Sequence, residues 1–304
     1  MPLRNQQRVQ TAIDYVTGHL SESLTVAEVA SKVHLSEFHF HRIFKKLTNE
    51  PFNQFVRRKR LEKAFHCLIR VNPPSMSEVS EACGFSSSAN FSKAFRAYFG
   101  FSASNHRKGT KGVDSKNGKL FSKYGKEISP SLLYNGSLSE LQINEITDKI
   151  QRIDVVNVEE SHYCCIASKQ GYALAGIKEA WSEMHHWLAH HDIAIEEGKS
   201  VAFCWDNKWL APEEVCRYES GYQLDDISWV HKAGIATRTR PAGRYLLIEF
   251  LGTSSDNEQF YLWLLSEYLP NANIVPVHRY VFERYLEINC ELNIFHFEIM
   301  IKVN

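Results

Sequence analysis

Apolar and polar residues follow two different patterns along this chain of 304 residues. Up to about residue 107, apolar positions recur every three or four residues, the spacing of one side of an α-helix. Beyond residue 150, runs such as RIDVVNVEE, RYLLIEFL and FHFEIMIKV alternate apolar and polar positions and predict β-strands. Helical segments such as ALAGIKEAWSEMHHWLAHH and DNEQFYLWLLSEYL lie between these runs. The pattern predicts a multidomain protein, with an all-α domain first and an α+β domain second.

A polar stretch separates the two patterns. The segment RKGTKGVDSKNGKLFSKYGKE, which begins at Arg107, is rich in Gly, Ser, Lys and Asn and has little periodic apolar pattern. We therefore expect a first domain over residues 1–107, a linker over 108–149 and a second domain over 150–304.

The first domain contains an internal repeat. VAEVASKVHLS at 26–36 aligns with MSEVSEACGFS at 76–86, at an offset of 50 residues. FHRIFKKLTNEP at 40–51 aligns with FSKAFRAYFGFS at 91–102, so one residue is inserted between the aligned blocks. Two copies of a unit of roughly 25 residues are too few to form a solenoid. They predict a tandem pair of small helical modules.

The first copy has the sequence features of a helix-turn-helix unit. Thr25 and Glu28 match a capping box that begins a short helix. A turn at 33–35 follows, and Ser36 then caps a second helix. After this copy, NQFVRRKRLEKAFHCLI at 53–69 predicts one longer helix that carries the basic run RRKR.

The second copy repeats these features. Ser75 and Glu78 match the capping box, and Gly84 supplies the turn. Ser86 or Ser87 then caps the next helix. Its predicted inner residues are Phe91, Phe95 and Phe99.

The second helix of the first copy, residues 36–46, has an apolar and a basic side. At about 100° per residue, its inner side consists of Phe40, Ile43, Phe44 and Leu47. Its outer side carries Phe38, His41, Arg42, Lys45 and Lys46. A helix that presents such residues can enter the major groove of DNA. The alternative is an amphipathic helix with a solvated basic face, which the repetition of the unit disfavours.

Each outer residue has a chemical role that DNA binding would use. Arg42 can donate two hydrogen bonds to a guanine, and His41 can donate to a base or a phosphate. Phe38 can pack on a thymine methyl group, while Lys45 and Lys46 can neutralise phosphates. The N-terminus of the helix at Ser36 offers backbone N–H groups to a phosphate. In the second copy the matching positions are Ser88, Ala89, Asn90, Ser92 and Lys93, which predict weaker base reading.

Charge separates the two halves more sharply than composition does. Residues 1–126 hold 21 basic and 9 acidic side chains, a net charge of +12, whereas residues 127–304 hold 14 and 26, a net charge of −12. The basic half is a candidate for binding a polyanion. The seven cysteines include no C-x-x-C pair, and no apolar run resembles a signal peptide or a membrane span. We therefore expect reduced thiols and a cytoplasmic protein without a membrane partner.

The second half is rich in aromatic residues, and its elements repeat. Strand, helix and two strands occur once over about 152–230 and again over about 234–303. All six tryptophans lie in this half. Most of its aromatic residues are expected in the core, while some can line a cavity for an apolar or aromatic ligand. Glu283 alternates with apolar residues in VFERYLEI, so it can point inward toward a cationic ligand or lie exposed on its strand.

A histidine cluster, HHWLAHH at 185–191, is a weak metal candidate. His186 and His190 have the i, i+4 spacing of a helical metal pair. The glutamate of an H-E-x-x-H site is absent, because Trp187 occupies that position, and no third ligand is evident. We therefore expect a helix face, with no metal and no cofactor.

The first domain resembles the DNA-binding domain of the AraC/XylS family of bacterial transcription regulators. The resemblance covers about residues 8–107 and depends on SEFHFHRIFKKLTNEPFNQFVRRKRLEKA and EVSEACGFSSSANFSKAFRAYFGFSASNHR. It implies two helix-turn-helix units that reach successive major-groove turns on one face of DNA. By this resemblance Phe38, His41 and Arg42 read bases in the first unit. Ser88, Asn90, Ser92 and Lys93 do so in the second.

The second domain resembles the GyrI-like effector-binding domain. The resemblance covers about residues 150–304 and depends on EAWSEMHHWL, EEVCRYESG, RPAGRYLLIEFLG and VFERYLEI. It implies an antiparallel sheet and a two-fold repeat around a ligand cavity that contains a carboxylate, here Glu283. On matching segments the aromatic candidates are Trp181, Trp205, Tyr218 and Tyr285. The family's His-x-Gly-x-Tyr element is SKQGY here, so its histidine is missing.

Together these features predict a sequence-specific transcription regulator, an activator that works with RNA polymerase and senses a small apolar or cationic effector. Two alternatives remain open. A GyrI-like domain can be a hydrolase, in which Glu283 with Tyr218 or Tyr285 would activate a water. The second domain can also bind another protein in place of a small ligand. We do not expect an enzyme, because the sequence shows no G-x-S-x-G or phosphate loop.

Overall fold

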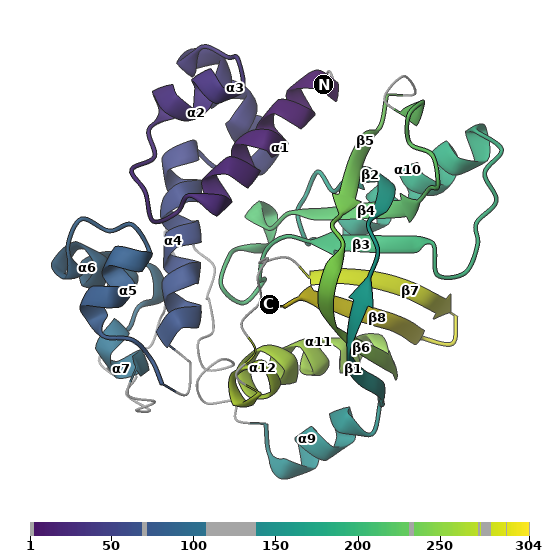
Figure 1. Cartoon of the computed structure of the whole chain (residues 1–304). Helices are drawn as coiled ribbons and strands as arrows, with labels where there is room; N and C mark the ends of the chain where they lie inside the picture. Colours follow the sequence, from purple (N-terminus) through teal and green to yellow (C-terminus); the bar gives the residue numbers. More distant parts are fainter. Residues whose placement is uncertain are drawn as a thin grey trace. The chain divides into compact units, whose positions relative to one another are not determined.

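The computed structural model describes residues 3–68, 72–107, 138–230, 234–272, 274, 281–289 and 291–303. The chain divides into two compact units. The first comprises Met1–Asn135 and Trp209–Val215, and the second comprises Gly136–Lys208 and Cys216–Asn304. The first unit is built from helices and the sheet belongs to the second (Figure 1). The predicted all-α and α+β fold types are therefore confirmed.

Seven α-helices are described in the first unit. They are α1 (Leu3–Gly18), α2 (Val26–Lys32), α3 (Glu37–Thr48), α4 (Phe52–Leu68), α5 (Met76–Ala82), α6 (Ser88–Phe99) and α7 (Ala103–Arg107). α2 with α3 and α5 with α6 are the two predicted helix pairs, and α4 is the predicted connecting helix. The turn of each pair has a left-handed residue at the same place in the repeat, His34 (φ 54°) and Gly84 (φ 72°).

Hydroxyl side chains begin the helices of both pairs, with one difference from the prediction. The N-caps that accept a hydrogen bond from the N–H three residues on are Thr25, Ser36, Ser75 and Ser87. Ser75 and Glu78 form the complete capping box. The predicted box at Thr25 is only half formed, since the Glu28 carboxylate accepts a hydrogen bond from Tyr15 of α1 at 2.6 Å.

Two aromatic clusters fill the first unit, one for each helix pair. The first contains Phe40, Phe44, Phe52 and Phe55. The second contains Phe65, Phe91, Phe95 and Phe99. The predicted inner residues of α3 and α6 are therefore buried, except that Leu47 is only partly buried. Because α4 supplies residues to both clusters, it connects the two modules by packing as well as by sequence.

Gly84 occupies a position that alanine does not fit. A Cβ there would overlap the carbonyl oxygen of Leu20 and lie 2.9 Å from Nη2 of Arg60, whose Nε donates to the same carbonyl at 2.9 Å. We expect Gly84→Ala to lower the free energy of unfolding by about 2–4 kcal/mol, because the alanine adds backbone strain and steric overlap. Urea denaturation measures this change. Gly18→Ala is the control, since a Cβ there meets nothing within 4 Å. An equal loss in both variants would contradict the steric explanation.

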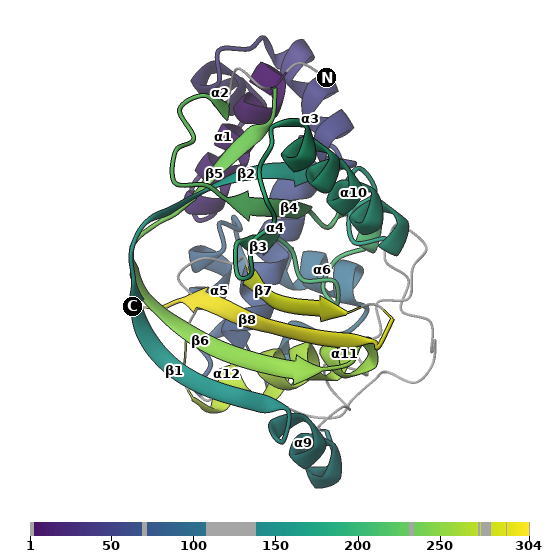
Figure 2. The same ribbon diagram turned by 90° about the vertical axis from the view of Figure 1, so that its right-hand side faces the viewer.

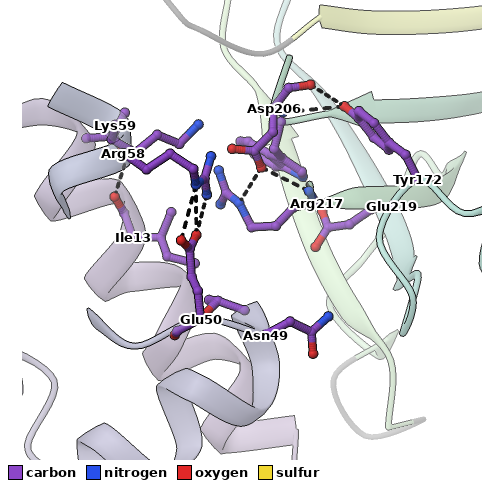
Figure 3. A network of polar contacts seen from close by, with 12 residues as sticks. Ile13, Asn49, Glu50, Arg58, Lys59, Tyr172, Asp206, Arg217 and Glu219 are labelled. Carbon is purple, nitrogen blue, oxygen red and sulfur yellow. Dashed lines mark hydrogen bonds and ion pairs between the residues drawn. The ribbon is translucent and has the colours of Figure 1, made fainter. Parts of the chain in front are cut away.

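The basic run of α4 is largely structural. Arg58, which is 2% exposed, donates from Nε to Glu50 at 3.0 Å and from Nη1 to Glu62 at 2.6 Å. Its Nη2 also pairs with Glu50, as Figure 3 shows. Lys59 pairs with Glu62 at 2.9 Å. Of the four residues in the run only Arg57 is exposed, so the net charge of this half overstates the charge available to a polyanion.

The second unit contains one antiparallel sheet with helices. Its elements are α9 (Glu140–Thr147), β1 (Ile150–Val158), β2 (Ser161–Ala167), α10 (Leu174–His190), β3 (Ser200–Cys204), β4 (Tyr218–Gln223), β5 (Ala236–Arg240), β6 (Gly243–Gly252), α11 (Ser254–Trp263), the π-helical η3 (Leu264–Tyr268), α12 (Leu269–Asn271), β7 (Val281–Asn289) and β8 (Ile294–Lys302). The strand order is β1-β6-β8-β7-β3-β4-β2-β5. Within the described ranges, no helix has the length and apolar character needed to cross a membrane.

The sheet has an internal two-fold repeat, as predicted, although each half has two strands before its helix where one was predicted. β1-β2-α10-β3-β4 corresponds to β5-β6-α11-β7-β8, because each strand pair has a counterpart. β2 pairs with β4 as β6 pairs with β8, and β1 pairs with β6 as β5 pairs with β2. β3 and β7 meet at the centre of the sheet. The repeat therefore brings its two halves together at β3 and β7.

Strand register assigns side chains to the two faces of this sheet. Glu283 of β7 is opposite Ala202 of β3, and Tyr218 of β4 is opposite Cys204, so these four side chains share one face. α10 lies on that face, because Ser220 donates to the Ala180 carbonyl at 3.0 Å. α11 lies there too: Phe260 packs on Phe297, which is opposite Tyr285. Figure 2 shows the sheet with both helices from a second side.

Candidate functional site

The first recognition helix, α3, presents an exposed outer side. Phe38 is 82% exposed, although Phe40 and Phe44 of the same helix are buried. Its exposed basic residues are Arg42, Lys45 and Lys46. His41 is half-buried, and Ser36 is the N-cap. A single exposed apolar ring is common on protein surfaces, so it is the company of the exposed basic residues on the same side of α3 that marks this surface as a candidate for binding DNA.

The second recognition helix, α6, has a less charged outer side. Ala89, Asn90, Ser92 and Lys93 are exposed and Ser88 is half-buried. The Asn90 side chain donates to the hydroxyl of Ser86 at 2.8 Å. This bond occupies one of its two N–H donors, so α6 offers fewer donors to a base than α3 does.

In the second unit, the Glu283 carboxylate is the centre of a buried polar cluster. Glu283 is 6% exposed. Tyr285, two residues on in β7, donates to one carboxylate oxygen at 2.5 Å, and Tyr261 of α11 donates to the other. The Cys204 side chain of β3 also bonds to this carboxylate. The cluster thus draws on the central strands and on one helix of the repeat.

Two further aromatic residues extend this cluster toward α10. Trp181 donates from Nε1 to the hydroxyl of Tyr218 at 2.7 Å, and that hydroxyl lies 3.5 Å from the hydroxyl of Tyr285. The Trp181 and Tyr285 rings meet edge to face, with centroids 5.5 Å apart. The structure therefore brings together four of the five predicted ligand residues: Trp181, Tyr218, Glu283 and Tyr285. We name these four residues with Tyr261 and Cys204 the Glu283 cluster.

Burial controls the protonation of the cluster. It raises the pKa of the Glu283 carboxyl, although the hydrogen bonds from Tyr261, Tyr285 and Cys204 oppose that shift. Burial also raises the pKa of the Tyr218, Tyr261 and Tyr285 hydroxyls and of the Cys204 thiol, each of which is further raised by the Glu283 charge. These four groups therefore stay protonated, and three of them donate hydrogen bonds to the carboxylate.

Trp205 is not part of the Glu283 cluster. Phe203 of β3 is opposite both Glu219 and Phe282, which places it on the other face of the sheet. Trp205 stacks on Phe203, with centroids 5.6 Å apart, and its Nε1 donates to Glu219 at 3.1 Å. The sequence could not show this, because Trp205 follows the end of β3 and its facing depends on strand register.

Sequence reasoning missed Tyr261, Cys204 and Tyr172 as contributors to this region. Tyr172 packs on Tyr218 with ring centroids 6.1 Å apart. The repeat contained one signal for Tyr261: it is the eighth residue of α11, as Trp181 is the eighth of α10. Cys204 carried no such signal, since a lone cysteine at a strand end is common.

The histidine cluster lies on α10, with His185, His186 and His190 exposed. In the part of the chain that the structure describes, no group of three or more His, Cys, Asp or Glu residues could hold a metal ion. His191 instead packs on Trp187, with ring centroids 4.3 Å apart.

The fold defines a protein with two similar helix pairs and a repeated α+β domain, and comparison with known families identifies both parts. A model of a helix-turn-helix domain matches residues 29–109. A model of the GyrI-like small molecule binding domain matches residues 151–304, about half of the chain. The chain belongs to the GyrI-like small molecule binding domain family. The predicted combination with an AraC-type helix-turn-helix domain is confirmed.

Several curated relatives are regulators by name. The probable transcriptional regulator LumQ of Photobacterium leiognathi is 35% identical over 94 residues, 31% of this chain and 38% of LumQ. The Msm operon regulatory protein of Streptococcus mutans is 40% identical over 87 residues, 28% of this chain and 31% of that protein. Regulatory protein SoxS of Salmonella typhimurium is 27% identical over 105 residues, 34% of this chain and 97% of SoxS. The chain thus spans about a third of the length of the first two.

Among solved structures, the DNA-binding domain of AdpA in complex with a target DNA is 27% identical. The match covers 33% of this chain and 89% of that domain, with a TM-score of 0.32.

Proposed function

We propose that this protein is a sequence-specific DNA-binding transcription regulator of the activating kind, whose second unit senses a small molecule. The observation that carries the proposal is the outer side of α3, where an 82% exposed Phe38 accompanies exposed Arg42, Lys45 and Lys46 on a capped helix. The same helix pair occurs again as α5 and α6. A relative named as the transcriptional activator RhaS of Klebsiella pneumoniae, 31% identical over 105 residues, supports activation.

The outer residues of α3 have divided roles in this proposal. Phe38, His41 and Arg42 read base edges in the major groove, whereas Lys45 and Lys46 contact phosphates beside the backbone N–H groups at Ser36. In α6 the corresponding readers are Ser88, Asn90, Ser92 and Lys93. α3 then supplies most of the sequence discrimination, because a guanidinium can form two bonds to one guanine.

Arg42→Ala tests base reading. We expect it to weaken binding to the preferred DNA, selected from a random pool, by about 1–3 kcal/mol and to relax discrimination at one base pair. Lys46→Ala is the matched control, and we expect it to weaken binding to all sequences alike and to lower the salt dependence. Fluorescence anisotropy with single-base variants of the selected DNA measures both. A uniform loss for Arg42→Ala would contradict base reading.

The second unit binds its effector at the Glu283 cluster in this proposal. A buried carboxylate surrounded by aromatic rings can bind an apolar molecule or a hydrophobic cation. Trp181, Tyr218 and Tyr285 supply the rings. Trp205 stays a candidate only for a contact on the opposite face. A screen of small molecules by tryptophan fluorescence tests this assignment against the alternative of a protein partner, which a null result across apolar and cationic compounds would favour.

We do not propose catalysis. Both oxygens of Glu283 accept hydrogen bonds from tyrosines, an arrangement that favours holding a charge over activating a water as a general base. Turnover of a bound ligand, lost in Glu283→Gln, would overturn this conclusion. As a regulator of this kind, the protein would recruit RNA polymerase and act in the cytoplasm. The domain limits 1–107 and 150–304, joined by 108–149, stay part of the proposal.

A further inference from the structure

The connection between β3 and β4 has an unusual position in the fold. Its central segment, Trp209–Val215, belongs to the first compact unit, although both flanks belong to the second. The Leu210 side chain is fully buried in the aromatic cluster that includes Phe65 and Phe99. Tyr98 of α6 donates to the Leu210 carbonyl at 2.9 Å. The segment is therefore part of the core of the second helix-turn-helix module.

This segment also bonds to the end of the first recognition helix. Asn49, the left-handed C-cap of α3, donates from Nδ2 to the carbonyl of Glu214 at 2.8 Å. Tyr98 lies in the last turn of α6. Seven consecutive residues thus bond to the C-terminal ends of both helices that carry the proposed DNA-reading side chains.

The flanks of the same segment lead directly to the Glu283 cluster. Cys204 precedes it and Tyr218 follows it, and both are members of the cluster. Val215 and Tyr218 are three residues apart, a span of roughly 10 Å of extended chain. Any displacement of Tyr218 therefore acts on the segment over a short length of backbone.

Polar contacts make the base of this connection rigid. The N–H of Trp205 donates to the Arg217 carbonyl at 3.0 Å. The backbone N–H and Nε of Arg217 both donate to Oδ2 of Asp206 at 2.9 Å. Tyr172, which packs on Tyr218, donates to the Asp206 carbonyl at 2.6 Å, as Figure 3 shows. A rigid base transmits a shift of Tyr218 instead of absorbing it.

We propose that Trp209–Val215 transmits effector binding at the Glu283 cluster to the recognition helices α3 and α6, an inference that rests on the proposed function. A ligand that pairs with Glu283 displaces the Tyr285 hydroxyl. Tyr218 follows, because its hydroxyl lies between the Tyr285 hydroxyl and the Trp181 Nε1–H that donates to it. The segment then shifts against Tyr98 and Asn49. Because coupling is reciprocal, DNA binding at α3 and α6 changes ligand affinity by the same factor.

Hydrogen exchange of the full chain tests this route without ligand or DNA. Tyr218→Phe perturbs the cluster, and Tyr222→Phe on the same strand, which removes a bond to Ala194, is its control. We expect Tyr218→Phe alone to change exchange in the α6 peptides, by about fivefold, the lower end of typical coupling. That response should be lost in a Tyr98→Phe/Leu210→Ala background. It should be reduced in the milder Tyr98→Phe background.

Tyr15→Phe, which removes a tyrosine bond to Glu28 elsewhere in the first unit, should leave the response intact. Unchanged exchange in α6 after Tyr218→Phe would overturn the proposed route. So would an equal response with and without the Tyr98→Phe and Leu210→Ala substitutions. Either result is separate from the DNA-binding test on Arg42, so a failure of the route and a failure of the proposed function are distinguishable.

Discussion

Replacing Arg58 by alanine is expected to lower the free energy of unfolding by about 3–5 kcal/mol, the range for removing one partner from a buried ion pair. Arg58 bonds to both Glu50 and Glu62, and all three side chains are nearly inaccessible to water. The substitution leaves two buried carboxylates without their shared guanidinium. Because α4 connects the two modules, we expect the helical circular dichroism signal of the variant to be lost at a lower urea concentration than that of the unmodified protein.

Arg57→Ala is the matched control for this prediction. Arg57 is the neighbouring arginine on α4 and is exposed, so its removal should change stability by about 0.5 kcal/mol or less. Circular dichroism in urea measures both variants. If Arg58→Ala were no more destabilising than Arg57→Ala, the ion pairs of α4 would not contribute to the stability of the fold.

Glu283→Gln is expected to have the largest effect on ligand binding. Removing one partner of a buried charge pair costs about 2 kcal/mol or more, roughly 30-fold in affinity. We therefore expect the affinity for a hydrophobic cation, such as benzyltrimethylammonium, to fall by at least that factor in calorimetric titration. Glu287→Gln, an exposed position on the same strand, should bind as the unmodified protein does. Equal affinity in all three proteins would exclude Glu283 as the cation partner.

The same substitution should remove a pH dependence whose direction follows from burial. Burial raises the pKa of Glu283 in the folded protein. The folded state therefore holds this proton more tightly than the unfolded state, and the resulting stability is complete below the ordinary carboxyl pKa. It is lost as the pH rises through the raised value. Cation affinity changes in the opposite direction, because binding needs the ionised carboxylate. Glu283→Gln should flatten both dependences.

The helical half of the fold could be predicted from sequence because its information is local. The caps, turns and apolar spacing that define a helix all lie within a few residues of it. Because the two copies align, the helix assignments in one copy support those in the other. Phe38 could be placed outside and Phe40 and Phe44 inside from a 100° rotation alone. The alternation of its runs also indicated that the second half is repeated, but it predicted one strand before each helix, and the structure has two.

Local sequence failed where a side chain had two possible partners. Glu28 was expected to complete a capping box, but its carboxylate accepts a hydrogen bond from Tyr15, which is 13 residues earlier in the chain. Arg58 belongs to a basic run of α4, yet in the structure it pairs with Glu50, which lies outside that helix. Helical spacing indicates on which side of its helix a residue lies. It gives no information on which residues of other elements contact that side.

By itself, the sequence determined that this protein has two tandem helical modules with an exposed basic face, followed by a repeated α+β domain. Only the tertiary structure decided which residues surround Glu283: it added Tyr261 and Cys204 and placed Trp205 on the opposite face. It alone assigned Trp209–Val215 to the helical unit. The physical reason is that strand register and helix docking depend on interactions between residues far apart in the chain, whereas helix caps and apolar periodicity depend on neighbours.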